Sequence, residues 1–140
     1  MSDKEKFEGF KQKMIDENEK KYGEEIRKKF GDSIIDASNS KMMGLTAEQH
    51  EESEKLSEKI NCLLKTAFEQ GDPAGELAQN VCILHKEWLG YFWNHYSKKA
   101  HFGLAQIYVD DPRFREYYDS VAVGCAEFLR DSMKIYCGQN

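Results

Sequence analysis

Hydrophobic residues between Leu77 and Tyr118 recur at helical spacing, and the segment Val81–Tyr96 is the richest of them in aromatic side chains. Both tryptophans of the chain lie in this segment. Its aromatic residues within nine positions are Trp88, Tyr91, Phe92, Trp93 and Tyr96. Apolar positions fall on more than one helical face, so we expect a central helix packed nearly all round. The other helices should dock onto it, since burying one large apolar side chain contributes roughly 1.5–3 kcal/mol.

The first third of the chain has a much thinner apolar stripe. Residues 2–29 are dominated by Lys and Glu, which predicts one or two weakly amphipathic helices, followed by a short helix from Ser33 to about Lys41. Ordering each backbone residue costs roughly 1–2 kcal/mol, and such a stripe buries little. We therefore expect a mobile lid in residues 1–45 and a helical core in residues 46–140, together forming one domain over residues 1–140.

Capping signals predict where the core helices begin and end. Thr46 and Gln49 fit a capping box, which should start a helix that runs past Phe68. Gly71 is a stop signal, and Asp72-Pro73 is typical of a helix start, so the central helix should begin there.

Three further signals divide the rest of the chain. Residues 94–97 should end the central helix, with Ser97 capping the next one. Asp111-Pro112 predicts a short helix, with Asp111 as its cap and Arg113 in a charge pair that orients the turn. A last helix should extend from about Val121 to Tyr136 and end at Gly138.

Composition agrees with an all-α fold of about six to eight helices in a single domain. The chain has 140 residues, of which 40% are hydrophobic and 32% charged, and only two prolines. A formal net charge of −5 argues against a nucleic-acid partner, because phosphate binding requires a basic patch. No apolar run is long enough to span a membrane, and the first residues do not resemble a signal peptide, so we expect a cytoplasmic location. The oligomeric state is left open.

The cysteines and histidines suggest no cofactor. The four cysteines are widely separated and form no C-x-x-C pair, so we expect small buried hydrophobes, with a reactive thiol as the alternative. A metal or haem site involving His85, His95 and His101 is the less favoured interpretation, because no carboxylate pattern supports ligation. No catalytic constellation is apparent, and we expect neither a metal, nor a cofactor, nor enzymatic activity.

Aromatic residues supply the candidate binding site. Ten of the seventeen aromatic residues fall between Trp88 and Tyr118, and clefts lined by aromatics with a few polar groups are the usual form of a small-molecule site. For any single residue, packing in the core is the alternative interpretation. The candidate ligand-binding residues are Trp88, Tyr91, Phe92, His95, Tyr96, His101, Tyr108, Phe114 and Tyr117.

Several short motifs in the second half occur in a characteristic order. They are His85-Lys86-Glu87-Trp88, Phe92-Trp93, His101-Phe102-Gly103-Leu104, Tyr108-Val109-Asp110-Asp111-Pro112-Arg113-Phe114, and Glu127-Phe128-Leu129-Arg130-Asp131 after Gly124. In this order and spacing the chain resembles the TipAS antibiotic-recognition domain. The resemblance continues more weakly into the first half through Phe7-Glu8-Gly9-Phe10, Tyr22, Glu25, Phe30-Gly31-Asp32 and Ser38.

The resemblance implies a globin-like helical domain that binds bulky peptide-like antibiotics, above all thiopeptides, in a cleft that the N-terminal segment helps to close. Because the usual MerR-type DNA-binding domain has no counterpart in these 140 residues, the expected function is non-catalytic sequestration of such a ligand. Thiopeptide-binding members carry a cysteine just before the Ser that starts the H-x-G-L helix, and Tyr96 stands there. Reversible binding is therefore expected. A protein-interaction module whose apolar cleft receives a partner helix is the alternative.

Overall fold

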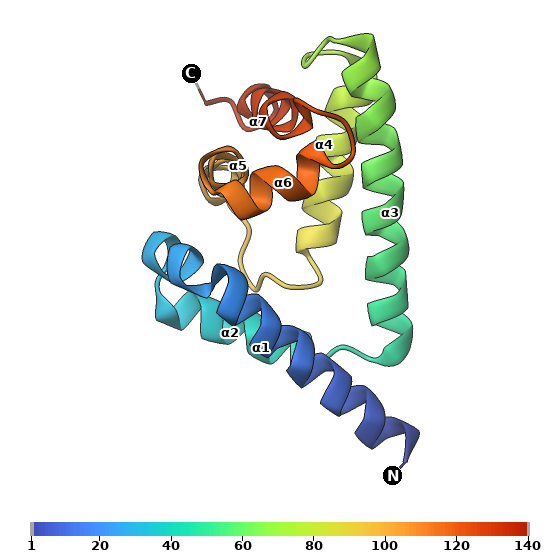
Figure 1. Ribbon diagram of the computed structural model, residues 1–140, viewed down its shortest axis with the longest axis vertical. Coiled ribbons are helices and arrows are strands. Elements are labelled where there is room, and N and C mark those ends of the chain that lie inside the picture. Colours follow the sequence, from blue (N-terminus) through green and yellow to red (C-terminus); the bar gives the residue numbers. More distant parts are fainter. Residues whose placement is uncertain (1, 140) are drawn as a thin grey trace.

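The computed structural model describes residues 2–139, which form helices and no strand (Figure 1). The helices are α1 (Asp3–Phe30), α2 (Asp32–Met43), α3 (Ala47–Gln70), α4 (Glu76–Leu89), α5 (Lys98–Asp110), α6 (Pro112–Asp119) and α7 (Cys125–Tyr136). The all-α fold class expected from the sequence is confirmed. The arrangement is consistent with the globin-like one that the resemblance implies.

Helix starts that depend on a local cap agree with the sequence. The Thr46 side chain accepts a hydrogen bond from the Gln49 amide, and the Gln49 side chain accepts one from the Thr46 amide, which completes the capping box of α3. Ser97 accepts from the Ala100 amide at the start of α5. Asp111 accepts from the Arg113 amide, with Pro112 in the first turn of α6.

The central helix α4 is shorter at both ends than predicted. Asp72 caps only a turn, in which its carboxylate accepts from the Ala74 amide, and α4 starts at Glu76. The helix ends at Leu89, and Leu89 also accepts through its carbonyl from the amides of Phe92 and Trp93. Residues 90–97 are therefore a connection of turns, and the predicted helical continuation to Tyr96 is wrong.

The last helix also begins later than predicted. Gly124 precedes it with φ 101°, a left-handed conformation that favours glycine, and α7 starts at Cys125 instead of Val121. The Asp119 carboxylate accepts from the amides of Gly124 and Ala126, at 3.3 and 3.1 Å. These contacts satisfy amides at the start of α7 that have no partner within the helix.

The main core lies between α3, α4, α5 and α7. Its buried members on α4 are Ala78, Val81, Cys82 and Leu89. The opposite side of α4 faces solvent, where Ile83 is 50% exposed, so the prediction of a helix packed nearly all round is wrong. Three of the cysteines are buried as expected, but Cys62 is exposed, and none forms a disulfide.

Helices α1 and α2 form a hairpin beside this core (Figure 1). Their backbones approach each other closely, and neither comes comparably close to any other helix in the described range. A small second cluster, built on Ile15, Met42 and Leu45, holds the hairpin together. The buried Lys11 ammonium donates to the carbonyls of Met43 and Leu45, which fixes α1 to the connection between α2 and α3.

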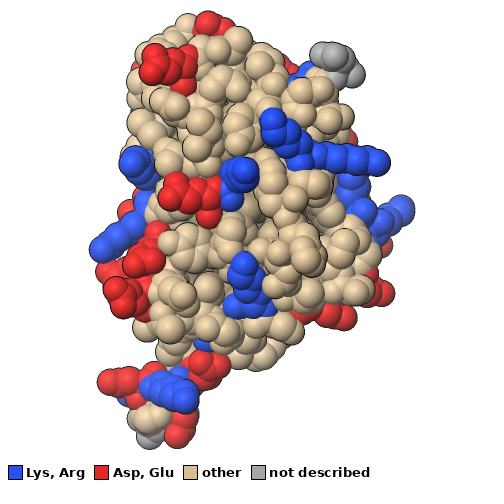
Figure 2. All heavy atoms as spheres, turned by 180° about the vertical axis from the view of Figure 1, so that it is seen from behind, with Lys and Arg blue, Asp and Glu red and all other residues tan. Residues whose placement is uncertain are grey.

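Charged side chains of both signs are interspersed over the face shown in Figure 2, which carries no continuous basic surface. Within residues 2–139, no helix combines the length and apolar character that crossing a bilayer requires.

Candidate functional site

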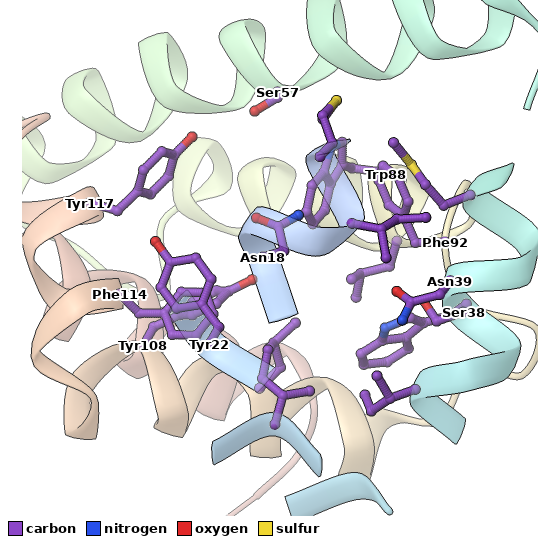
Figure 3. Close-up of a pocket in the computed structure, with 18 of the residues that line it drawn as sticks. Asn18, Tyr22, Ser38, Asn39, Ser57, Trp88, Phe92, Tyr108, Phe114 and Tyr117 are labelled. Carbon is purple, nitrogen blue, oxygen red and sulfur yellow. The ribbon is translucent and has the colours of Figure 1, made fainter. Parts of the chain in front are cut away.

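A cavity of about 410 Å³ lies between the α1/α2 hairpin and the core helices (Figure 3). Its volume is within the range of small-molecule sites, roughly 300–1,000 Å³. Helices α3 and α4 and the turn after α4 contribute to its wall, as do α5 and α6. Most of the lining is apolar or aromatic, and polar groups stand at a few positions along it.

Helical periodicity explains which residues of α1 and α3 face the cavity. On α1 they include Ile15, Asn18, Tyr22 and Ile26, which are three or four positions apart and therefore lie on one face. On α3, the residues Glu54, Ser57 and Asn61 follow the same spacing. A mixed apolar and polar face of α1 and a mainly polar face of α3 thus meet the aromatic residues of α4 and α6 across the cavity.

Stacked aromatic rings form one side of the cavity. Tyr22 of α1 stacks on Phe114 of α6 with ring centroids 4.0 Å apart. Tyr108 lies 5.3 Å from Phe114 and 4.6 Å from Tyr118. Figure 3 shows Tyr22, Tyr108 and Phe114 together, with Trp88 and Phe92 on another side of the cavity. Because Tyr22 is the one member from the hairpin, the stack also joins the hairpin to the core.

A chain of hydrogen-bonded side chains lies behind this wall. His85 Nδ1 is 2.8 Å from His101 Nε2, His101 Nδ1 is 2.7 Å from the Tyr96 hydroxyl, and His85 Nε2 is 3.2 Å from the Tyr108 hydroxyl. Burial lowers the pKa of His85 to about 3 and that of His101 to about 4. Both imidazoles are therefore neutral at pH 7, so this polar group brings no net charge to the cavity.

Glu19 lies on the hairpin side of the cavity, and Arg27 balances its negative charge. Its carboxylate accepts from Arg27 at 2.6 and 2.9 Å and from the Asn39 amide at 2.9 Å. The hydrogen bonds from Arg27 hold the pKa of Glu19 below its ordinary value. Arg27 also pairs with Asp32 and Asp36 of α2, so it ties the two helices of the hairpin together.

Five of the nine residues proposed from the sequence line the cavity: Trp88, Phe92, Tyr108, Phe114 and Tyr117. Their role as ligand contacts stays a prediction, now supported by a common location. The Tyr117 hydroxyl accepts from the Asn61 amide at 3.1 Å, which positions it at the α3 side of the cavity.

The other four proposed residues do not line the cavity. Tyr91 donates to Glu52 at 3.3 Å, and His95 is exposed on the turn after α4. Tyr96 and His101 belong to the buried hydrogen-bonded chain, and His101 is completely inaccessible to solvent. For Tyr91, His95 and Tyr96 the physical reason is the end of α4 at Leu89, because the turns that follow direct these side chains away from the cavity. His101 lies on α5 and is buried in the core instead.

The candidate residues proposed from the sequence include none from the hairpin, although the resemblance implied that the N-terminal segment helps to close the cleft. Asn18, Tyr22, Ser38 and Asn39 line the cavity, and Figure 3 shows them around its interior. The spacing of Ile15, Tyr22 and Ile26 was the available signal, but it identified only a weak amphipathic face.

Within the described residues, no three His, Cys, Asp or Glu side chains are grouped so that they can hold a metal ion. Burial raises the pKa of Cys82 to about 12 and also raises the pKa of Cys125 and Cys137, so these thiols are protonated at neutral pH. The arrangement offers an apolar, aromatic cavity with hydrogen-bonding groups and no activated nucleophile among these buried thiols.

Comparison with known proteins supports this description. The family profile described as the TipAS antibiotic-recognition domain matches residues 22–136. Among curated proteins, the HTH-type transcriptional activator mta of Bacillus subtilis is 24% identical over 98% of this chain and 53% of its own length. The HTH-type transcriptional activator TipA of Streptomyces coelicolor is 28% identical over 95% of this chain and 52% of its own.

A third relative is the HTH-type transcriptional regulator SkgA of Caulobacter vibrioides, which is 25% identical over 97% of this chain and 54% of its own length. The chain thus spans about half the length of the curated relatives it matches. No solved structure matches it significantly.

Proposed function

Because the chain belongs to the TipAS antibiotic-recognition domain family, we propose that it binds a bulky amphipathic small molecule or modified peptide, such as a thiopeptide antibiotic, without changing it chemically. The observation that carries the proposal is the aromatic cavity under the α1/α2 hairpin. Flat heteroaromatic rings of such a ligand suit the faces of Trp88 and the Tyr22–Phe114 stack. The side chains of Asn18, Ser57 and Asn61 supply polar partners for its amide groups.

The hairpin acts as a lid in this proposal. Several contacts join it to the core. The Lys41 ammonium donates to the carbonyls of Gly90 and Trp93 at 2.8 Å each, Phe30 packs edge-on against Trp93, and Tyr22 stacks on Phe114. Phe7 and Phe10 of α1 also pack edge-on against His50 of α3. A ligand larger than about 410 Å³ displaces the hairpin outward, and these contacts are the ones that must yield.

Binding is reversible in this account. Tyr96 has no thiol to add to a dehydroamino acid, and its hydroxyl is already engaged with His101. Cys82 and Cys137 are buried thiols with raised pKa values, which makes them poor nucleophiles. The position of the cavity under the hairpin favours a ligand held between the hairpin and the core over a partner helix, because a helix requires an open groove along its length.

A thermal-shift titration with thiostrepton and nosiheptide tests the proposal. A ligand that binds only the folded state raises Tm as its concentration rises. At a ligand concentration of a hundred times Kd, the free energy of unfolding increases by about 2.7 kcal/mol. Tryptophan fluorescence should be quenched in parallel, since Trp88 and Trp93 both line the cavity. Mass spectrometry of the recovered drug should show an unchanged mass. Unaltered Tm and fluorescence across the panel would contradict the proposal, and a changed drug mass would indicate an enzyme.

A further inference from the structure

The charged residues that line the cavity are both acidic. They are Glu19 and Glu54, and no Lys or Arg of the described chain joins them. The one histidine in the lining, His85, is held neutral because burial and the neighbouring His101 lower its pKa. A charged ligand in the cavity therefore contacts carboxylates and neutral groups. An anionic ligand finds no cation in the described lining to pair with.

The two carboxylates differ in how far the protein satisfies them. Glu19 is paired with Arg27 and hydrogen-bonded to Asn39. Within residues 2–139, no group donates a hydrogen bond to the Glu54 carboxylate, and His50 Nε2 lies 3.7 Å from it, which is too long for one. The Glu54 side chain is 58% exposed, so it can be approached by a ligand group. It is the carboxylate that the protein leaves available.

The basic side chains near the cavity do not line it. Arg27 is shared among Glu19, Asp32 and Asp36, and the Lys41 ammonium is bound to the Gly90 and Trp93 carbonyls. Lys21 and Arg113 lie over the ring of Tyr22, at 5.2 and 5.6 Å from its centroid, and Arg113 is paired with Asp111. Figure 3 shows Tyr22 well separated from Ser57, which is one helical turn from Glu54 on α3.

The aromatic lining also favours a positive charge on the ligand. The faces of indole and phenol rings carry negative potential and attract cations within about 6 Å of the ring centroid, tryptophan most strongly. Trp88 and Phe92, with centroids 5.0 Å apart, line the cavity together with Tyr117. An anion placed there would lose its hydration and gain no opposite charge.

We propose that the cavity selects cationic aromatic ligands over anionic ligands of the same shape, with Glu54 as the residue that recognises the positive charge. This inference rests on the proposed function and narrows its ligand class. A ligand with a protonated amine or delocalised cation next to flat rings would place the charge near Glu54 and the rings against Trp88. Because Glu54 is more than half exposed, its contribution is that of a partly screened ion pair, which corresponds to roughly 1.5- to fivefold in affinity.

Fluorescence anisotropy with three dyes tests the inference on the full chain. Rhodamine 6G is a cation, fluorescein is an anion built on the same xanthene ring system, and Nile red is neutral. Rhodamine 6G should bind at least about tenfold more tightly than fluorescein. E54Q should weaken the binding of rhodamine 6G by roughly 1.5- to fivefold and leave the binding of Nile red unchanged.

The control is E69Q, which removes the same charge from an exposed position on the same helix, fifteen residues or about 22 Å from Glu54. It should leave all three dyes unaffected, which separates a local effect from the net charge of −5. Circular dichroism of both variants verifies that they are folded.

Two outcomes overturn the inference and are distinguishable. If fluorescein or Nile red binds as tightly as rhodamine 6G, or if E54Q and E69Q behave alike, the charge preference is wrong and the proposed function stands. If none of the three dyes binds and thiopeptides also leave Tm unchanged, the proposed function fails together with the inference.

Discussion

His85 and His101 lie ring against ring in the protein interior, with His85 Nδ1 2.8 Å from His101 Nε2. A neutral imidazole has one donor nitrogen and one acceptor nitrogen, so the bonds that continue to Tyr96 and Tyr108 must all run in one direction. If Tyr96 donates to His101, then His101 donates to His85 and His85 donates to Tyr108. These hydrogen bonds connect Tyr108 in the cavity wall with Tyr96 in the turn after α4.

The histidine pair makes stability depend on pH. Burial lowers the pKa of His85 to about 3 and of His101 to about 4, whereas both titrate near 6.5 in the unfolded chain. The unfolded state thus binds more protons below pH 6.5, and stability falls as pH falls. Urea unfolding should show a loss of about 2 kcal/mol per histidine between pH 7 and pH 5. An unfolding free energy that is the same at both pH values would show that the pair is not buried as a neutral unit.

Replacing His101 should lower the free energy of unfolding at constant pH, because it interrupts the hydrogen-bonded network. His101→Phe leaves His85 Nδ1 and the Tyr96 hydroxyl without their partner, and each buried polar group left unsatisfied costs about 1–3 kcal/mol. The matched control is His95→Phe, at an exposed position, which should stay within about 0.5 kcal/mol of the wild type. Equal unfolding free energies of the two variants would contradict the network.

These contacts also show which parts of the fold can be predicted from sequence. Helix starts at Ala47, Lys98 and Pro112 were predictable because the capping side chain is adjacent to the helix. The start of α7 depends on Asp119, which reaches amides five and seven residues away and gives no local signal. Similarly, the end of α4 at Leu89 depends on a turn that periodicity alone did not reveal.

The residues of the candidate site also fall into those that the sequence identified and those that it did not. Aromatic enrichment identified Trp88, Phe92 and Tyr108, because large rings near a cavity stand out in composition. It equally selected Tyr96 and His101, whose polar atoms are used inside the protein. The hairpin residues were not among the candidates, since their weak apolar stripe becomes a cavity wall only when the core helices lie opposite.

The ammonium of Lys41 should hold the hairpin against the core. Lys41→Met removes two hydrogen bonds to carbonyls, from Nζ to Gly90 and Trp93, and bonds to charged groups contribute about 1.5–3 kcal/mol each before solvent screening. Amide hydrogen exchange in α1 and α2 should accelerate by about tenfold, while α4 and α7 change little. Lys13→Met, at an exposed position on α1, is the control and should match the wild type. Identical exchange in the two variants would remove Lys41 from the account of lid closure.

Tyr22 should matter through its ring and not its hydroxyl. Tyr22→Ala removes the 4.0 Å stack on Phe114 and one wall of the cavity, and aromatic pairs contribute about 0.5–1.5 kcal/mol beyond the area they bury. Affinity for a bound drug should fall by about tenfold or more. Tyr22→Phe keeps the stack and should bind within about twofold of the wild type. Equal losses in both variants would indicate that the hydroxyl, and not the stack, recognises the ligand.

Ligand-dependent hydrogen exchange of the whole chain tests most directly that the ligand lies between the hairpin and the core. With thiostrepton or rhodamine 6G bound, protection should rise together in three stretches that line the cavity, namely residues 15–26, 35–42 and 54–61. Protection that is absent from the hairpin and confined to residues 91–101, or to no segment at all, would contradict the account.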